Sequence, residues 1–276
     1  MSLIESIFYG FISGVTEFFP ISSKAHQAIL RYIFGVGTRN SLQELLVHIG
    51  LLLALFLGCR DVLYRLHREQ KAISMSRRRR RRSLDVKSLY DLRLIKTATF
   101  PLLIGLILCV VVWKWQDNLL TIMCFFIVNG LILLFAEHIQ HGNRDSRTMT
   151  GLDGIVMGIL GALSSFPGIS RTGIISAYAT ARGADNQNAV NWAVLLGIPA
   201  IIFAACYDIV LIFSVGVGAL SFPIIIGCIL SGIGAFAGGY VAISMLVSVL
   251  NHTGYAPFVY YSFGAALFSF VLYLIT

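Results

Sequence analysis

The last quarter of the chain carries no formally charged side chain. From Ile209 to Thr276, 68 residues contain no Asp, Glu, Lys or Arg. A membrane-spanning helix needs roughly 20 apolar residues, so this stretch is more than three times the necessary length. Charged residues make up only 12% of the whole chain, whereas soluble domains carry about 25%. The sequence therefore predicts an all-α integral membrane protein.

The positive charge is concentrated in one region. Thirteen of the 21 Lys and Arg residues lie between Arg60 and Lys96, and they include the run Arg77–Arg82. Loops that stay in the cytoplasm are enriched in such residues, so we predict a basic cytoplasmic loop over residues 60–96 that also contacts anionic membrane lipids. A run of arginines can also bind nucleic acid. In a membrane protein we favour the loop and predict no nucleic-acid partner.

Four apolar segments are short for a membrane span. Residues 3–21 and 25–34 are separated by a break at Pro20, and residues 152–166 and 169–181 by a break at Pro167-Gly168. Half-length segments with a break between them are typical of re-entrant helix-loop-helix hairpins. Longer apolar segments lie near residues 42–59, 97–113, 119–136, 190–213, 221–249 and 256–276. We therefore predict six transmembrane helices and two re-entrant hairpins.

The hairpins divide a single membrane domain, residues 1–276, into two similar halves. Each hairpin precedes three predicted spans, which gives repeat one at about residues 1–136 and repeat two at about residues 152–276. A short motif recurs in both: Gly10, Gly14, Phe19-Pro20 and Ser22, then Gly158, Gly161, Phe166-Pro167 and Ser170. With the basic loop inside, the first hairpin enters from outside and the second from the cytoplasm. The repeats are then inverted, and broken helices at matching positions indicate a binding site near the midplane.

The first hairpin carries several reactive side chains within ten residues: Glu17, Ser22, Ser23, Lys24 and His26. In a bilayer such groups persist only where they are buried in protein or line a wet cavity. Ser23 and His26 could act as nucleophile and base, or the imidazole could protonate a leaving phosphate. The alternatives are helix capping by Ser22 or Ser23, a structural His26, and contact of Lys24 with lipid phosphates.

Glu17 is the one acidic side chain in the interior of the first hairpin. A buried carboxylate must be paired, protonated or bound to a metal. Glu17 could therefore pair with Arg171, act as a base, or bind Mg²⁺ or Ca²⁺. In the first predicted span, Glu44 and His48 are four residues apart and share a helix face, either as a plain helix pair or as cavity lining.

The second hairpin presents an arginine directly after its break. Arg171 follows Pro167-Gly168-Ile169-Ser170, at the start of a helix if the break lies where we expect it. The guanidinium is always charged and its planar fork fits phosphate oxygens. Free backbone N–H groups at a helix start also favour an anion. We predict a phosphate site formed by Ser170, Arg171, Thr172 and Gly173 together with Ser22 and Lys24 of the first hairpin. The alternative for Arg171 is an interfacial arginine that reaches to lipid headgroups.

Both motifs resemble the undecaprenyl-pyrophosphate phosphatase family of the BacA type. Thr16-Glu17-Phe18-Phe19-Pro20-Ile21-Ser22-Ser23 followed by His26 is similar to the first family signature, Pro167 to Gly173 to the second, and Leu195 to Ala200 to a third. The resemblance covers nearly the whole chain in order and spacing. It implies catalytic roles for Glu17, Ser23, His26 and Arg171, with Ser23 the nucleophile and Arg171 the phosphate ligand.

The resemblance also implies an activity and a location. Members remove the terminal phosphate from a polyprenyl pyrophosphate and regenerate the lipid monophosphate used in cell-wall synthesis. They work with a divalent cation at the outer face of the bacterial inner membrane, have six spans and two re-entrant hairpins, and form dimers. For this chain we therefore expect Mg²⁺ or Ca²⁺ at Glu17, a polyprenyl pyrophosphate substrate and a homodimer.

Four positions depart from the family pattern. Ser13, His48, Ile175 and Asn191 stand where the family commonly has an acidic or amide residue, a glutamine, a hydroxyl residue and a glutamate, respectively. Loss of a carboxylate weakens a divalent-cation site, because hard cations need several oxygen ligands. The alternative function is a polyprenyl-phosphate transporter with weak or no hydrolysis, since inverted repeats and a midplane polar site suit transport equally well.

Overall fold

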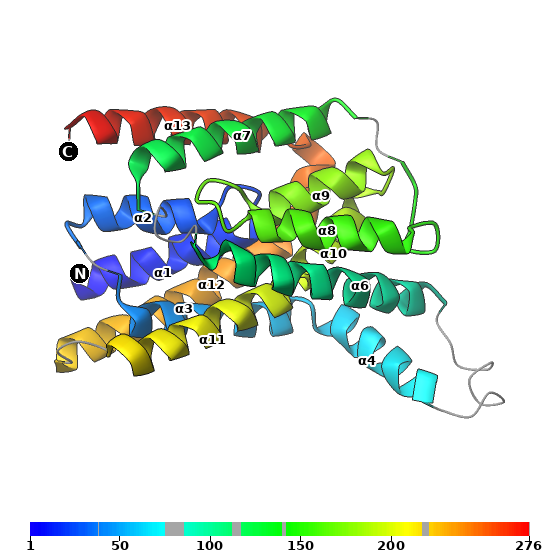
Figure 1. The fold of residues 1–276 in the computed structure, drawn as a ribbon, viewed down its shortest axis with the longest axis horizontal. Coiled ribbons are helices and arrows are strands. Elements are labelled where there is room, and N and C mark those ends of the chain that lie inside the picture. Colours follow the sequence, from blue (N-terminus) through cyan, green and yellow to red (C-terminus); the bar gives the residue numbers. More distant parts are fainter. Residues whose placement is uncertain (38, 75–85, 112–116, 140–141, 217–220, 276) are drawn as a thin grey trace.

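The computed structural model describes residues 1–37, 39–74, 86–111, 117–139, 142–216 and 221–275. Its named secondary-structure elements are all helices (Figure 1). They are α1 (Leu3–Phe18), α2 (Ser23–Ile33), α3 (Ser41–Gly58), α4 (Arg60–Ser74), α6 (Val86–Cys109), α7 (Leu119–Glu137), α8 (Gly151–Leu163), α9 (Arg171–Ala181), α10 (Asn186–Leu195), α11 (Gly197–Val215), α12 (Phe222–Thr253) and α13 (Ala256–Ile275).

Within the described ranges, six helical segments are long and apolar enough to cross a membrane. They are α3, α6 from Leu89, α7, the α10–α11 pair, α12 and α13. The prediction of six spans in a multi-pass membrane protein is confirmed at this level. The predicted span 190–213 is divided into α10 and α11 at Leu196. Gly197 and Pro199 follow this break.

Two pairs of shorter helices form hairpins. In Figure 1, α1 and α2 extend from the end of the molecule that carries the N-terminus, and α8 and α9 extend from the opposite end, so that the two turns meet in the middle. Local sequence sets the helix ends. Capping boxes begin α1 (Ser2 with Glu5) and α8 (Thr150 with Asp153), and the turns follow where Pro20 and Pro167 interrupt the helical pattern.

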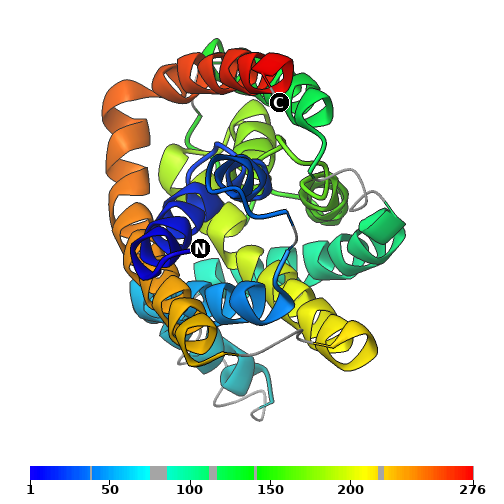
Figure 2. The same ribbon diagram turned by 90° about the vertical axis from the view of Figure 1, so that its left-hand side faces the viewer.

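Small residues allow each hairpin to pack closely on a long helix of the other half. α1 lies along α12 and α8 lies along α6. A Cβ atom at Gly10 would come within 1.9 Å of the Ser231 carbonyl oxygen, and one at Gly158 within 2.2 Å of the Ala98 carbonyl oxygen. Glycine is therefore required at both contacts, as in other close helix pairs within membranes. The long helices surround the hairpins in the end-on view (Figure 2).

The predicted basic loop over residues 60–96 is wrong in its secondary structure. Residues 60–74 form α4 and α6 begins at Val86. α4 is amphipathic: Leu66 is buried in a small cluster with Leu92 and Leu195, whereas Arg60 and Arg68 are exposed. The charge density suggested a loop, but apolar residues at helical spacing allow this segment to form a helix with one buried face. The arginine run Arg77–Arg82 lies outside the described residues.

A buried carboxylate joins the two arms of the second hairpin away from its turn. Asp153, in the first turn of α8, accepts hydrogen bonds from Thr150, from Tyr178 Oη at 2.9 Å and from Arg182 Nε at 2.7 Å. Burial raises the pKa of Asp153, but these hydrogen bonds outweigh it and lower the pKa to about 2. The charged form is thus maintained near neutral pH, where it holds the ends of α8 and α9 together.

Candidate active site

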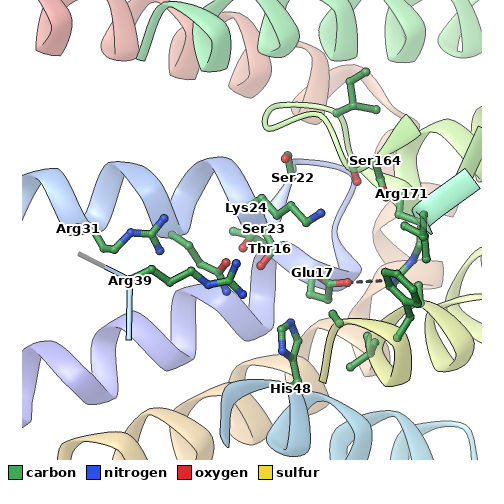
Figure 3. Close-up of a pocket in the computed structure, with 18 residues that line it drawn as sticks. Thr16, Glu17, Ser22, Ser23, Lys24, Arg31, Arg39, His48, Ser164 and Arg171 are labelled. Atoms are coloured by element: carbon green, nitrogen blue, oxygen red, sulfur yellow. Dashed lines mark ion pairs between the residues drawn. The ribbon is translucent and has the colours of Figure 1, made fainter. Parts of the chain in front are cut away.

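A polar cavity lies where the two hairpin turns meet (Figure 3). It occupies about 820 Å³ including its open mouth, and its polar lining comes from Thr16, Glu17, Ser22, Ser23, Lys24, Gln27, Arg31, Arg39, His48, Ser164, Ser170 and Arg171. One wall is apolar and comes mainly from α11 and the α8–α9 turn, with Leu106 of α6. The two motifs that the sequence placed at opposite halves of the chain therefore share one site.

Hydrogen bonds connect the two turns directly. The Gly168 N–H donates to Ser22 Oγ at 3.0 Å, Ser170 Oγ donates to the Phe19 carbonyl at 3.2 Å, and Thr172 Oγ1 donates to the Glu17 carbonyl at 3.2 Å. Ser22 is the one non-glycine residue with positive φ in the described ranges, at 62°. Such a conformation persists only where surrounding contacts fix it. The turn-to-turn contacts supply that constraint.

Asn129 of α7 also bridges the two turns, and sequence reasoning missed it. Its Nδ2 donates to the Pro20 carbonyl at 3.0 Å, and its Oδ1 accepts from the Ser170 N–H at 2.9 Å. Asn129 is fully buried. A lone amide within an apolar span was the available signal, because a buried polar group needs partners.

Arg171 lies at the first position of α9 and points toward the first hairpin (Figure 3). Its Nη1 is 2.9 Å from Oε1 of Glu17. Arg171 is 7% exposed, and within the described residues its Nε and Nη2 have no hydrogen-bond partner. The ion pair that the sequence offered as one option for Glu17 is therefore present. Two buried donors remain for an anion, since unpaired buried polar groups are costly.

The serines at the two helix starts differ in role. Ser170 is the N-cap of α9 and accepts from the Gly173 N–H at 3.1 Å. Ser22 is the N-cap of α2, but its side chain makes no capping hydrogen bond and instead accepts from the second turn. Ser23 lines the cavity, and its Oγ donates to the Ser13 carbonyl at 3.2 Å. Capping thus explains only part of the hydroxyl cluster.

The cavity is strongly basic. Lys24, Arg31, Arg39 and Arg171 line it, whereas Glu17 is the single carboxylate among its lining residues. Figure 3 shows Arg31 and Arg39 on the side of the cavity away from Arg171. Arg31 is held by Asp117 and by Glu44 at 3.4 Å. A wet cleft with this excess of cations favours a multiply charged anion.

His26 does not occupy the position that a Ser23 partner would need. Its Nδ1 is 2.7 Å from the Ser22 carbonyl and its Nε2 is 2.6 Å from the Tyr261 hydroxyl. The imidazole also stacks on the Tyr261 ring, and it is not among the residues that line the cavity. Both ring nitrogens therefore already have hydrogen-bond partners, and the structure does not bring His26 and Ser23 together as a catalytic pair.

His48 is the histidine that lines the cavity, and it is held by an acidic residue to which the sequence assigned no role. Its Nδ1 is 2.7 Å from Oδ2 of Asp208 on α11, and Oδ1 of Asp208 is 2.8 Å from Nη2 of Arg39. Asp208 is fully buried. A lone carboxylate in an apolar span was the available signal. Its partners, more than 150 positions away in the chain, could not be identified from spacing.

The described residues contain no group of three or more His, Cys, Asp or Glu side chains that could hold a metal ion. Oε1 of Glu17 is occupied by Arg171. A Mg²⁺ or Ca²⁺ site made by the protein alone is therefore not formed around Glu17. Mg²⁺ is often bound by one carboxylate together with substrate phosphates, and the site fits a cation only in that shared form.

Comparison with known proteins identifies the relatives of the chain. Residues 6–268 match the family described as "Bacitracin resistance protein BacA". The chain belongs to the BacA family. It is 28% identical over 274 residues to an "Undecaprenyl-diphosphatase" of Alkaliphilus metalliredigens, with 95% of each chain covered. It is 32% identical over 276 residues to an "Undecaprenyl-diphosphatase" of Thermodesulfovibrio yellowstonii, covering 98% of this chain and 97% of that protein.

In this BacA family member the four departures lie in different surroundings. Ser13 donates to the Tyr9 carbonyl at 2.7 Å, Ile175 is fully buried in the core, and Asn191 accepts from Gln187. Of the four, only His48 is among the cavity residues. Of the four departures, the histidine at position 48 is therefore the one that bears directly on the chemistry of this BacA site.

Proposed function

We propose that the protein is a polyprenyl pyrophosphate phosphatase that releases the terminal phosphate and returns the lipid monophosphate for cell-wall synthesis. The observation that carries the proposal is Arg171, which lines a basic cavity between the hairpin turns and has two buried nitrogens without a hydrogen-bond partner among the described residues. The names of the BacA relatives, undecaprenyl-diphosphatase, give the substrate class. A diphosphate head matches the charge of the cavity, and the apolar α11 wall suits the start of a lipid chain.

In this proposal each motif has a distinct task. Arg171 and the backbone N–H groups at the start of α9 bind the terminal phosphoryl group, with Thr172 and Gly173 forming the first turn behind it. Ser22 and Ser170 fix the two turns against each other. Glu17 orients Arg171 through Oε1, and the attacking hydroxyl comes from Ser23 or from a water. Lys24 neutralises charge that develops as the lipid monophosphate leaves.

The predicted divalent cation enters as part of this proposal. Glu17 would hold it together with oxygens of the bound diphosphate, because the protein alone supplies one carboxylate. When bound, the cation would neutralise phosphate charge. No step of the reaction as we describe it depends on its position.

A phosphate-release assay tests the function. Purified protein in detergent with Mg²⁺ is expected to release inorganic phosphate from undecaprenyl diphosphate and from farnesyl diphosphate. Glu17→Ala and Arg171→Ala should each lower the rate by at least about 100-fold, because both remove charge at the reacting group. EDTA should lower the wild-type rate, and added Mg²⁺ or Ca²⁺ should restore it. If EDTA leaves the wild-type rate unchanged, the cation proposal is wrong but the phosphatase proposal stands.

The same assay separates the phosphatase from the transporter. A transporter of polyprenyl phosphate would bind the lipid monophosphate tightly and release no phosphate from the diphosphate. That outcome in folded, monodisperse wild-type protein would overturn the phosphatase proposal. Arg77–Arg82 have no part in either mechanism, so a deletion of residues 77–82 should leave phosphate release unchanged.

We further propose that the two hairpins are re-entrant, belong to inverted repeats, and open the site to the outer side of the cytoplasmic membrane. Two observations support this proposal. The pairs α1–α2 and α8–α9 extend from opposite ends of the molecule in Figure 1, and the first helix of each pair packs in an equivalent way on a long helix, α1 on α12 and α8 on α6. The basic helix α4 lies at the end away from the N-terminus, which the positive-inside rule assigns to the cytoplasm. Arg39 then faces the outer side.

Cysteine labelling in intact cells tests this topology. In a background without the five native cysteines, Ser2→Cys and Gly37→Cys are expected to react with an impermeant maleimide from outside, since both arms of a re-entrant hairpin begin on one side. Lys71→Cys and Thr148→Cys should react only after permeabilisation. Opposite labelling of positions 2 and 37 would mean that the first hairpin crosses the membrane. The homodimer stays a prediction.

A further inference from the structure

We propose that His48, oriented by Asp208, is the general base of the phosphatase reaction. The inference rests on the proposed function and names a catalytic group for it. It arises from a contrast between two histidines: His26 belongs to a motif but does not line the cavity and has partners at both nitrogens, whereas His48 lies outside the motifs and lines the cavity. Figure 3 shows the His48 imidazole rising from α3 toward Glu17.

The hydrogen bond to Asp208 fixes the state of the imidazole. A carboxylate only accepts, so Nδ1 of His48 carries the hydrogen in the 2.7 Å contact with Oδ2. In the neutral ring Nε2 then bears the lone pair. Within the described residues no hydrogen bond involves Nε2, and the side chain is 14% exposed at the cavity. The arrangement presents a proton acceptor to the site, as the carboxylate–imidazole pair of serine hydrolases does.

Asp208 is well placed to orient His48 rigidly. It is fully buried on α11, and its second oxygen is held by Arg39 at 2.8 Å. The carboxylate therefore cannot rotate away without leaving a buried charge unpaired, which is strongly unfavourable. The other charged groups around the ring are Glu44, one turn earlier on α3 and bonded to Tyr9 and Arg31, and the cavity residues Glu17, Lys24 and Arg171.

The cavity otherwise offers few proton acceptors. Glu17 is the only carboxylate in its lining and its Oε1 is paired with Arg171. Lysine and arginine side chains do not accept when charged. An attacking hydroxyl that must lose a proton therefore finds its acceptor in Nε2 of His48 or in the remaining oxygen of Glu17. Because Glu17 is tied to the phosphate ligand, we assign the orienting contact to Glu17 and the proton transfer to His48.

The attacking hydroxyl oxygen, from Ser23 or water, forms a bond to the terminal phosphorus while its proton moves to Nε2 of His48. The bond from that phosphorus to the bridging oxygen breaks, and the lipid monophosphate leaves with the electron pair. His48 then gives its proton to the departing phosphate oxygen. If Ser23 attacks, a second turn of the same step with water releases phosphate and restores the serine.

Chemical rescue tests the assignment on the full-length protein with farnesyl diphosphate. His48→Asn places an amide N–H close to where the Nδ1–H of His48 lies, so it retains a donor for Asp208 but cannot take a proton. It is expected to lower kcat by roughly 10²- to 10⁴-fold with KM changed by less than about threefold. His48→Ala leaves space at the cavity, and imidazole in solution should restore its kcat in a saturable way. His138→Asn is the control, since His138 is an exposed residue at the C-terminal end of α7 and is bonded to the Leu134 carbonyl.

Each outcome decides the proposal. A His48→Asn rate within about threefold of wild type overturns it, as does a loss carried by KM. A loss of kcat in His48→Ala that imidazole does not restore assigns His48 a structural role and overturns it too. Unaltered thermal unfolding of both variants in detergent excludes misfolding. If wild-type protein releases no phosphate, the proposed function itself fails and this inference fails with it.

Discussion

Replacing Arg171 with lysine is expected to lower kcat/KM for polyprenyl diphosphates by roughly 10²- to 10³-fold. Lysine preserves the positive charge, but it is a point charge without the planar fork that binds two phosphate oxygens at once. In the structure Nη1 of Arg171 already serves Glu17 at 2.9 Å, while Nε and Nη2 have no partner in the described part of the chain. A lysine could satisfy Glu17 or the phosphate, but not both in this geometry.

Arg182→Lys provides the matched control for that experiment. Arg182 also binds a carboxylate, Asp153, through Nε at 2.7 Å, but it lies at the end of α9 away from the cavity. Its substitution should leave phosphate release near the wild-type rate. Equal activity of Arg171→Lys and wild type would show that a charge alone suffices at this position, and the bidentate role of Arg171 would be wrong.

The positions of the two helix pairs in the chain could be predicted because their signals are local. Proline breaks, N-terminal capping residues and apolar segments of ten to twenty residues are read directly along the chain. The starts of α3, α7 and α13 lie within one residue of the predicted positions. The prediction failed at α4, where high charge density concealed a helix whose apolar face is narrow and centred on Leu66.

The composition of the site could be predicted only in part. Glu17, Ser22, Ser23, Lys24, Ser170 and Arg171 line the cavity as the two motifs suggested. His48 was offered as possible cavity lining, but Arg31, Arg39 and the Asp208 partner of His48 were not identified, because these pairings connect α2 with residue 117 and α3 with α11. Such contacts depend on how the helices pack, and spacing along one chain does not report them. His26 illustrates the converse error: a residue inside a motif need not face the cavity.

A methyl group at Gly168 is expected to reduce both stability and activity severely, because this residue joins the two turns. Gly168 has φ of 116°, a conformation that costs an L-residue roughly 1–3 kcal/mol. An added Cβ would also lie 2.7 Å from the backbone of Phe125 and Phe126, and relief of such overpacking costs about 1–3 kcal/mol more. Any shift of the turn breaks the Gly168 N–H to Ser22 Oγ hydrogen bond at 3.0 Å.

Gly35→Ala separates the free-energy cost of a left-handed backbone conformation from the effect of disrupting the contact between the two turns. Gly35 follows α2 with φ of 63°, but an added Cβ there would meet no atom within 4 Å. This variant should lose only the roughly 1–2 kcal/mol of a left-handed alanine and keep phosphate release near wild type. Gly168→Ala should unfold at a clearly lower temperature and lose at least about 100-fold in kcat, since a displacement of 1 Å at a reacting group is enough for that. If both variants retain equal activity, the turn-to-turn contact does not position Arg171 against Glu17, and the cavity must be assembled by the surrounding long helices instead.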